Sequence, residues 1–224
     1  MTFPHATCAF LKDLARNNNR EWFAANKPRY QLEWLEPATA FVSEVSASMA
    51  ALAPPHEAQA RINGSIRRLQ RDTRFSQDKT PYDPKLHLIF WTGDHPNRSP
   101  AIHVALHPER LGIGAGLFAM NAAQLDRYRH AIATNRSARG QLDDILTGLR
   151  HYDCALTDET LKRAPKGFDV AEPHQTLLKR KGLVVHNHQA ALAPETIADA
   201  AWMASFYDAA AALNHWLVEN VGDG

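Results

Sequence analysis

Hydrophobic residues near the start of the chain recur every three or four positions, which is the spacing of one buried face of an α-helix. Over residues 5–16 this pattern brings Phe10, Leu11 and Leu14 to the same side. Three asparagines follow at once, and asparagine favours turns and helix caps over helix interiors. The pattern therefore predicts a first helix over 5–16 that ends at the asparagine run.

A second helical stretch begins after the asparagines and is interrupted by proline. Asn18 can cap it, with Glu21 three residues later in a variant of the capping box. Pro28 lies inside the pattern and should kink the helix or force a restart, whereas Pro37 suits the first turn of a further helix. That further helix carries one apolar stripe and ends at a proline pair: Phe41, Val45, Met49 and Leu52, then Pro54 and Pro55.

The middle of the chain changes to strand patterns. Residues 86–91 form a short apolar run, 101–107 alternate strictly, and 111–120 return as a second strand after a turn. In the alternating strand two sets of side chains should face opposite ways: Ile102, Val104 and Leu106, against His103, Ala105 and His107. Glycine occupies every second position from Gly112 to Gly116, so a helix, an aromatic side chain or a ligand is expected to approach the sheet there.

The last third of the chain is mostly helical. Apolar spacing predicts helices near 122–133, capped by Asn121, and near 137–149, and a long terminal helix over 194–221. Between them lie a basic loop, a short helix and a strand, at 161–169, 172–180 and 182–190. Helices around a strand-rich middle predict the α+β class, as a single domain over 1–224 with a mainly antiparallel sheet in the middle of the chain, flanked by N-terminal and C-terminal helices.

Composition mainly excludes classes of protein. The 224 residues are 45% hydrophobic, enough for a substantial core, and 25 basic against 24 acidic residues give a net charge of +1. A global basic field for nucleic acid or an anionic membrane is therefore absent. Cys8 and Cys154 are far apart, which argues against a disulfide scaffold or a cysteine-rich zinc site. Without a signal-peptide pattern or an apolar run of ~20 residues, a soluble cytoplasmic protein with no membrane association is expected.

One short block, RDTRFSQDKTPY at 71–82, concentrates hydrogen-bonding side chains. From Arg61 to Lys85 the chain holds seven cations and three acids, so this stretch is basic although the chain as a whole is nearly neutral. The guanidinium group of arginine matches carboxylate and phosphate oxygens with a planar fork of donors. The block is therefore the first place to look for an anion site.

An extended conformation would let several side chains of the block donate toward one anion. The candidate ligand-binding residues are Arg71, Arg74, Ser76, Lys79, Thr80 and Tyr82. Asp72 and Asp78 would orient the cations or act as a base, and they are candidate catalytic residues for that reason. Lys166, in the basic loop at 161–169, would join the site if the two loops fold close together.

Two other interpretations of the block stay open. The same side chains could form ion pairs that lock an irregular loop onto the sheet, with no ligand involved. Alternatively, the basic segment 61–85 could belong to a non-catalytic interaction module that binds an acidic protein or nucleic acid. An enclosed cluster would favour a small ligand, whereas a flat cationic stripe with aromatic neighbours would favour the interaction module.

Three separated blocks of the chain resemble a known family. FLKDLARNNNREWFAANKPRY, RDTRFSQDKTPY and LKRAPKGFD match, in this order, a widespread bacterial and fungal family, domain of unknown function (DUF) 2461. The resemblance covers roughly residues 8–218 and implies a shared fold unit, but no activity. The chain departs from the family pattern at 83–87, where the family reads lysine-threonine-histidine, and at Gln77, where a lysine is usual. The departure at Gln77 predicts weaker anion binding than in relatives.

Twelve histidines raise the question of a metal, and their spacing restricts it. His103 and His107 lie four strand residues apart, about 13 Å, too far to share one zinc ion with bonds of ~2 Å. His186 and His188 lie about 7 Å apart on one strand face and could converge on a metal, but the sequence offers no third ligand nearby. No cofactor is expected, because GxGxxG, P-loop, GxSxG and HExxH patterns do not occur.

The sequence thus favours a pocket that binds a small anionic or polar ligand, and leaves open whether the protein is an enzyme. Its walls would be 71–82, the glycine face of the strand at 111–120, and Lys166. Acid–base or phosphoryl-directed chemistry would suit these groups. His87, expected beside the cations and acids of the block, is the candidate general acid or base.

Overall fold

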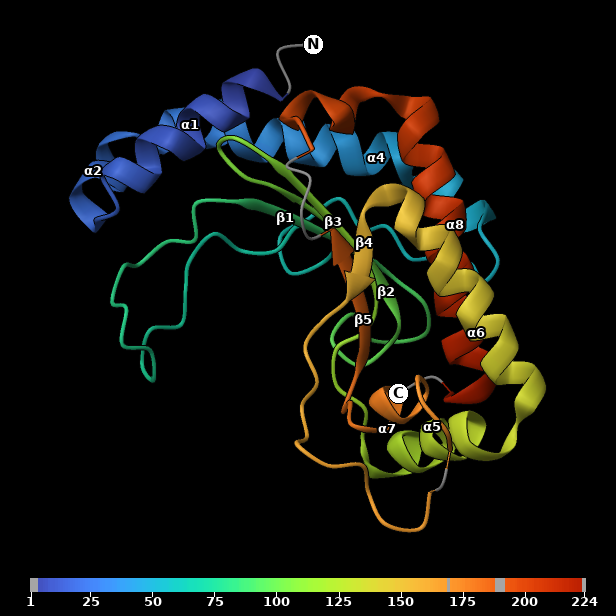
Figure 1. Cartoon of the computed structure of the whole chain (residues 1–224). Helices are drawn as coiled ribbons and strands as arrows, with labels where there is room; N and C mark the ends of the chain where they lie inside the picture. The colour runs from blue at the N-terminus through green and yellow to red at the C-terminus, as the bar shows by residue number, and fades with distance from the viewer. Residues whose placement is uncertain (1–3, 169, 188–191, 223–224) are drawn as a thin grey trace.

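The structure, a computed structural model, describes residues 4–168, 170–187 and 192–222. Helices lie at both ends of the chain around a sheet (Figure 1). The N-terminal helices are α1 (His5–Arg16), α2 (Arg20–Ala25), α3 (Lys27–Arg29), the π-helix η1 (Tyr30–Leu35) and α4 (Glu36–Ala51). The later helices are α5 (Ala122–Thr134), α6 (Arg136–Leu149), the 3-10 helix η2 (Arg150–Tyr152), α7 (Gln175–Leu178), the 3-10 helix η3 (Pro194–Ala198) and α8 (Ala200–Asn220). The strands are β1 (Leu86–Trp91), β2 (Ala101–Leu106), β3 (Leu111–Leu117), β4 (Cys154–Leu156) and β5 (Leu183–Asn187). The predicted α+β class is confirmed.

The strands form one antiparallel sheet in the order β1-β2-β3-β5-β4. Its first three strands follow one another in sequence, as the patterns predicted, and β5 then returns from the last third of the chain. In the observed register Ile89 lies opposite His103, His103 opposite Gly114, and Gly114 opposite His186. One row of the sheet therefore carries two histidines with a glycine between them.

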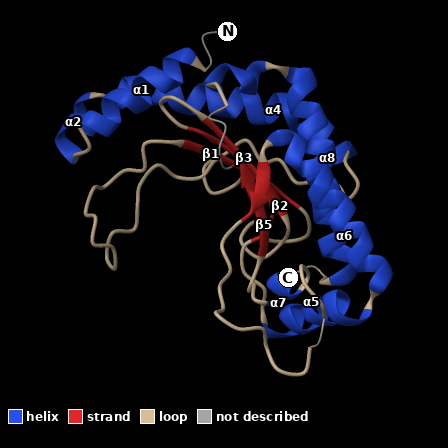
Figure 2. Ribbon diagram, in the orientation of Figure 1, coloured by secondary structure: helices blue, strands red, loops and turns tan. Residues whose placement is uncertain are grey.

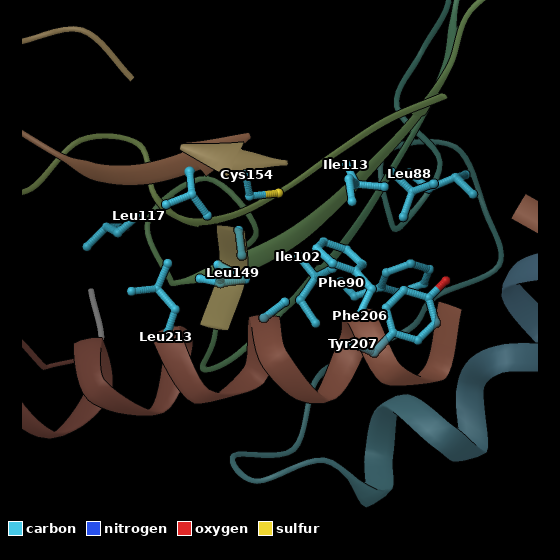
Figure 3. Close-up of a cluster of buried hydrophobic side chains, with 14 of the residues drawn as sticks. Leu88, Phe90, Ile102, Ile113, Leu117, Leu149, Cys154, Phe206, Tyr207 and Leu213 are labelled. Atoms are coloured by element: carbon cyan, nitrogen blue, oxygen red, sulfur yellow. The ribbon is translucent and has the colours of Figure 1, made fainter. Parts of the chain in front are cut away.

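The sheet has one face buried by helices and one face bordered by loops. Figure 2 shows the helices as an arc along one side of the sheet, with long loops on the other. On the helical side Phe90 and Ile102 pack beside Phe206 and Tyr207 of α8 (Figure 3). Alternation along the strands places the opposite set of side chains, including His103, on the other face, which we call the open face. One end of this face is covered, because Ile89, Trp91 and Ala101 form a small buried cluster there. The two opposite side-chain faces that the pattern of residues 101–107 predicted are thus observed.

The N-terminal helices follow the prediction except at one cap. Asn19, not Asn18, caps α2, because its side chain accepts a hydrogen bond from the backbone N–H of Trp22 at 2.9 Å. The Asn18 amide instead donates to the Tyr82 carbonyl at 2.9 Å and accepts from the Tyr82 N–H at 3.1 Å. It thereby imitates a backbone peptide and ties the base of the 71–82 block to the helices. Pro28 does mark an interruption, since α2 ends before it and η1 follows.

The remaining elements depart from the prediction in three places. The long terminal helix is divided at Asp199, whose side chain accepts a hydrogen bond from the Trp202 N–H and so starts α8 anew after η3. Strand β3 stops at Leu117, three residues earlier than expected. The three-residue strand β4 was not predicted, because so short a segment has no periodicity.

Gly116 provides a test of how tightly the sheet is packed. Its φ of +127° is strained for any residue with a side chain, and an added methyl group would overlap the carbonyl of Leu183 on the neighbouring strand. We expect Gly116→Ala to lower the free energy of unfolding by about 2 kcal/mol or more. The matched control Gly140→Ala, in α6 with no atom within 4 Å of the new methyl group, should be neutral or stabilising by up to about 1 kcal/mol. Urea denaturation measures both, and equal stability of the two variants would contradict the assignment.

Candidate functional site

The open face of the sheet is hollowed by a cavity of about 600 Å³. Ala105 on β2 lies opposite Gly112 on β3, and Gly114 follows two residues along β3. These residues form the floor of the cavity, because none of them carries a side chain larger than methyl. Phe118, 73% exposed, stands at its rim just beyond the end of β3. The glycine pattern thus leaves room on the sheet where two of the three glycines line a cavity.

Two histidines of this face form a pair. The β1–β2 register sets His87 diagonally beside His103, and His87 Nε2 lies 3.0 Å from His103 Nδ1. When both rings are neutral, one proton lies between these nitrogens. The two outer nitrogens then present one N–H donor and one lone pair. Their roles exchange when the lone pair takes up a proton, the shared proton crosses to the other ring, and that ring releases its outer proton. The pair can therefore offer a ligand a donor and an acceptor without carrying charge.

The surroundings keep these histidines neutral. Burial lowers the pKa of His87 to about 3, and the neighbouring His103, Lys85 and Arg67 add to this effect. Burial, then Arg67, lowers the pKa of His103 to about 4. The sequence placed His87 beside Lys79 and Asp78, but the structure places it beside Lys85 and His103. With a pKa this low, His87 carries no second proton at neutral pH, so it suits the role of a neutral hydrogen-bonding group and not that of a cationic general acid.

A second cavity, of about 530 Å³, adjoins the first and shares Lys85 and His87 with it. Three arginines contribute to its lining: Arg67, Arg68 and Arg71. Arg67 is half-buried, its guanidinium donates to the Asn97 side chain, and burial lowers its pKa. Within the described ranges no carboxylate lies at ion-pair distance from Arg67 or Arg68. A desolvated cation without a counter-charge is costly, so this cavity favours an anion.

The 71–82 block folds as a loop that projects from the sheet, drawn in teal in Figure 1. A bridge between Gln70 and Tyr82 closes its base, and the chain turns at 74–75 instead of staying extended as expected. Arg71 donates to the Asp78 carboxylate and to the Thr80 side chain, inside the loop. Much of the hydrogen-bonding capacity of the block is therefore used by the block itself.

Other expected ligand donors are also satisfied locally. Arg74, with a side chain 77% exposed, donates to Asp72 at 2.7 Å, and Lys79 donates to the Thr73 carbonyl at 2.9 Å. The Arg74 hydrogen bond lowers the pKa of Asp72, and the Thr80 N–H, then Arg71, lowers that of Asp78 to about 2. These acids are therefore ionised partners of the loop and poor proton acceptors.

The structure divides the predicted site residues into two groups. Arg71, Asp72 and His87 line the cavities. The others lie outside the two linings: Arg74, Ser76, Asp78, Lys79, Thr80, Tyr82 and Lys166. Tyr82 is a core residue, stacked on Phe23 with ring centroids 4.3 Å apart. The convergence of these donors on one anion, expected from an extended block, is not the arrangement observed.

Sequence reasoning did not include Arg67, His103 or Arg110 among the site residues. Arg67 was counted in the basic stretch and His103 on the polar face of its strand, so both features were visible in the sequence. Arg110 belongs to the turn between β2 and β3 and reaches the same cavity as His103. The β2–β3 hairpin brings Arg110 to the cavity of His103, and a backbone hydrogen bond to His87 places Arg67 at the adjoining cavity. These are tertiary contacts that no local pattern encodes.

A metal site finds no support in the described part of the chain, where no three His, Cys, Asp or Glu side chains gather closely enough to hold an ion. His186 lies on the open face of β5 and lines the larger cavity. Its proposed partner His188 lies outside the described residues, so that pairing stays a prediction. In the same ranges no helix combines the length and apolar character needed to cross a membrane.

The histidine pair predicts a pH dependence of stability. In the folded chain the pKa of His103 is lowered from 6.5 to about 4, so between these pH values the unfolded chain binds more protons than the folded one. The free energy of unfolding should therefore fall as pH drops from about 6.5 to 4, by at most about 3 kcal/mol from His103. Denaturant titrations at pH 7 to 4 test this: His103→Asn, which keeps a hydrogen-bonding side chain, should lose less stability than the wild type. An unchanged pH dependence in this variant would contradict it.

Comparison with known proteins places the chain in a family. Neither the curated proteins nor the solved structures include a match. The profile of one family, described as "Conserved hypothetical protein (DUF2461)", matches residues 6–217, which is nearly the whole chain. This agrees with the resemblance carried by the three sequence blocks. The chain belongs to the DUF2461 family.

Proposed function

We propose that the two adjoining cavities bind one small anionic ligand, and that the histidine pair lies beside its anionic group. The observation that carries this proposal is Arg67, a half-buried guanidinium that lines a cavity and has no carboxylate partner among the described residues. A ligand carboxylate or phosphate at this point would restore the missing counter-charge. Forked, charge-assisted hydrogen bonds of this kind are the strong ones in proteins.

The balance of charge over both cavities supports an anion. Their linings hold five cations and two carboxylates: Arg67, Arg68, Arg71, Lys85 and Arg110, with Asp72 and Asp83. Both carboxylates already have a partner. Asp72 is paired with Arg74, which is not part of the linings, and Asp83 is paired with Lys85 at 3.0 Å. A net positive potential in a recess attracts and retains anions more strongly than the same charges on a flat surface. Arg71 lines the smaller cavity but is paired with Asp78, which lies outside this count. The lining cations without a carboxylate partner among the described residues are therefore Arg67, Arg68 and Arg110. Lys166 and the outer loop donors lie outside the proposed site.

If the protein is an enzyme, the histidine pair is its best candidate for acid–base work. Through the shared proton, one outer nitrogen can take a proton while the other releases one, and neither ring needs to become charged. The position of the pair beside Lys85 and Arg67 suits a reaction at or next to an anionic group. Asp72 and Asp78 are not part of this proposal, because their loop partners hold them ionised.

A second candidate function, binding of an acidic protein or nucleic acid, is favoured by the tip of the loop. Phe75 is 95% exposed there, with the Arg74 guanidinium 5.8 Å from its ring centroid. An exposed aromatic beside a cation suits stacking on a base or contact with a partner protein. This function would use Arg74 and Phe75, whereas the cavity would use Arg67, so the two candidates predict different mutational effects.

We expect Arg67→Gln to weaken binding of inorganic phosphate by roughly 10- to 100-fold, since it removes charge-assisted hydrogen bonds worth about 1.5–3 kcal/mol. The unliganded variant should be as stable as the wild type or more stable, because an unpaired half-buried charge is lost. The matched control Arg74→Gln should leave phosphate affinity unchanged. Isothermal titration calorimetry and thermal unfolding measure both effects.

The opposite results would decide against the cavity. A wild-type chain that does not bind phosphate, or an Arg67→Gln variant with unchanged affinity, would overturn the proposal. If Arg74→Gln and Phe75→Ser instead abolish binding of a single-stranded oligonucleotide or an acidic peptide, the interaction module is the better account.

A further inference from the structure

We propose that the ligand is a phosphate monoester whose organic part ends in a planar ring, the chemical class of a mononucleotide. Its phosphate would lie by Arg67 and Lys85 in the smaller cavity, and its ring on the floor of the larger one. This inference rests on the proposed function and adds what the two cavities recognise.

The two cavities differ in chemistry but share a boundary. The smaller one is lined almost entirely by charged and amide side chains, whereas the larger adds Phe118, Val184 and glycine backbone to its cations and histidines. Lys85 and His87 belong to both linings. A single ligand that spans this boundary therefore needs one strongly anionic end and one end with apolar faces.

Packing within the sheet does not explain why glycine occupies both β3 positions on the floor of the larger cavity. Gly114 has to be glycine, because a methyl group there would come within 2.6 Å of the Val185 carbonyl oxygen. Gly112 does not: a methyl group would meet Ala105 at 3.5 Å and an Arg110 nitrogen at 3.7 Å, which are ordinary contacts. Glycine inside a strand lowers stability and packs nothing. The end of the Arg110 side chain lies beside Gly112, and the space left next to it is best explained by something that lies flat upon the sheet.

The dimensions of the floor suit one ring system. Ala105 and Gly112 lie opposite one another on β2 and β3, about 4.8 Å apart, and Gly114 follows two residues along β3, about 7 Å from Gly112. The bare surface therefore has about the size of one small ring system, and His186 borders it on β5. Phe118 at the rim holds its ring edge-on to His103, with centroids 6.4 Å apart, and keeps most of its surface in solvent. An aromatic exposed beside a bare backbone surface offers a wall against which a planar ring can pack.

The distance between the anion site and the floor of the larger cavity also fits a mononucleotide. His87 lies opposite Ala105, and Ala105 lies opposite Gly112, so two strand spacings, about 10 Å, separate His87 at the shared boundary from Gly112 on the floor. A phosphate joined to a ring through a sugar covers this span, whereas a free phosphate or a short sugar phosphate would leave the floor bare.

The test uses three probes on the full chain: inorganic phosphate, ribose 5-phosphate, and the mononucleotides AMP and UMP. We expect the wild type to bind at least one mononucleotide tenfold or more tightly than ribose 5-phosphate, which has the phosphate and sugar but no ring. Gly112→Ala should weaken mononucleotide binding about tenfold and leave the affinities for phosphate and ribose 5-phosphate unchanged. Gly140→Ala, far from the sheet face, should bind all probes as the wild type does, and thermal unfolding confirms that both variants are folded.

The outcomes separate this inference from the proposed function. If phosphate binds and Arg67→Gln weakens it, but neither mononucleotide binds more tightly than ribose 5-phosphate, the anion site stands and the ring site is wrong. Unchanged mononucleotide affinity in Gly112→Ala overturns the ring site in the same way. If none of the probes binds, or Arg67→Gln leaves every affinity as it was, the proposed function fails and the ring site fails with it.

Discussion

The antiparallel register of β1, β2 and β3 is the constraint on which the rest of the structure depends. Side chains alternate along a strand, so a shift of one residue would exchange the two faces of the sheet. In the observed register Ile102 and Val104 are fully buried beneath the helices, and the residues between them face the loops. That same register sets His103 beside His87 and opposite Gly114. The core and the cavity are therefore two consequences of one pairing, and neither can change without the other.

The cations around the open face are of two kinds. Those of the projecting loop are neutralised where they stand, and Arg71 with Asp78 is the central case. A loop with little apolar burial holds its shape through such bonds, so its density of polar groups is explained in large part by its own folding. Arg67 differs because it comes from the segment that crosses beside β1, where its N–H bonds the His87 carbonyl and its side chain faces the cavity. Charge that the fold does not neutralise is what indicates a ligand.

The sequence predicted most elements of the fold and located the neighbourhood of the site, for identifiable reasons. Long amphipathic helices and alternating strands carry their period over many residues, so α1, α6 and β2 could be read directly. The side-chain partners inside 71–82 could not, because an extended segment and a closed loop have the same composition. The pattern favoured Arg74 over Arg67 as a ligand-binding residue, although Arg67 is half-buried at a cavity and Arg74 is paired in solvent. Which cation lacks a partner depends on tertiary contacts that no local spacing contains.

In the proposed site, one set of groups supplies the positive charge that attracts an anion, and another supplies the hydrogen bonds that orient it. Arg67 lowers the pKa of both His87 and His103, so an anion bound at Arg67 would offset that field and raise both values. By linkage, protonation of the pair would strengthen anion binding to the same extent. Since the values begin near 3 and 4, this coupling acts below neutral pH. At neutral pH the fixed cations provide attraction, and the uncharged imidazoles provide one donor and one acceptor at defined positions. Such a division discriminates between anions by their hydrogen-bonding geometry, which cations alone do not do.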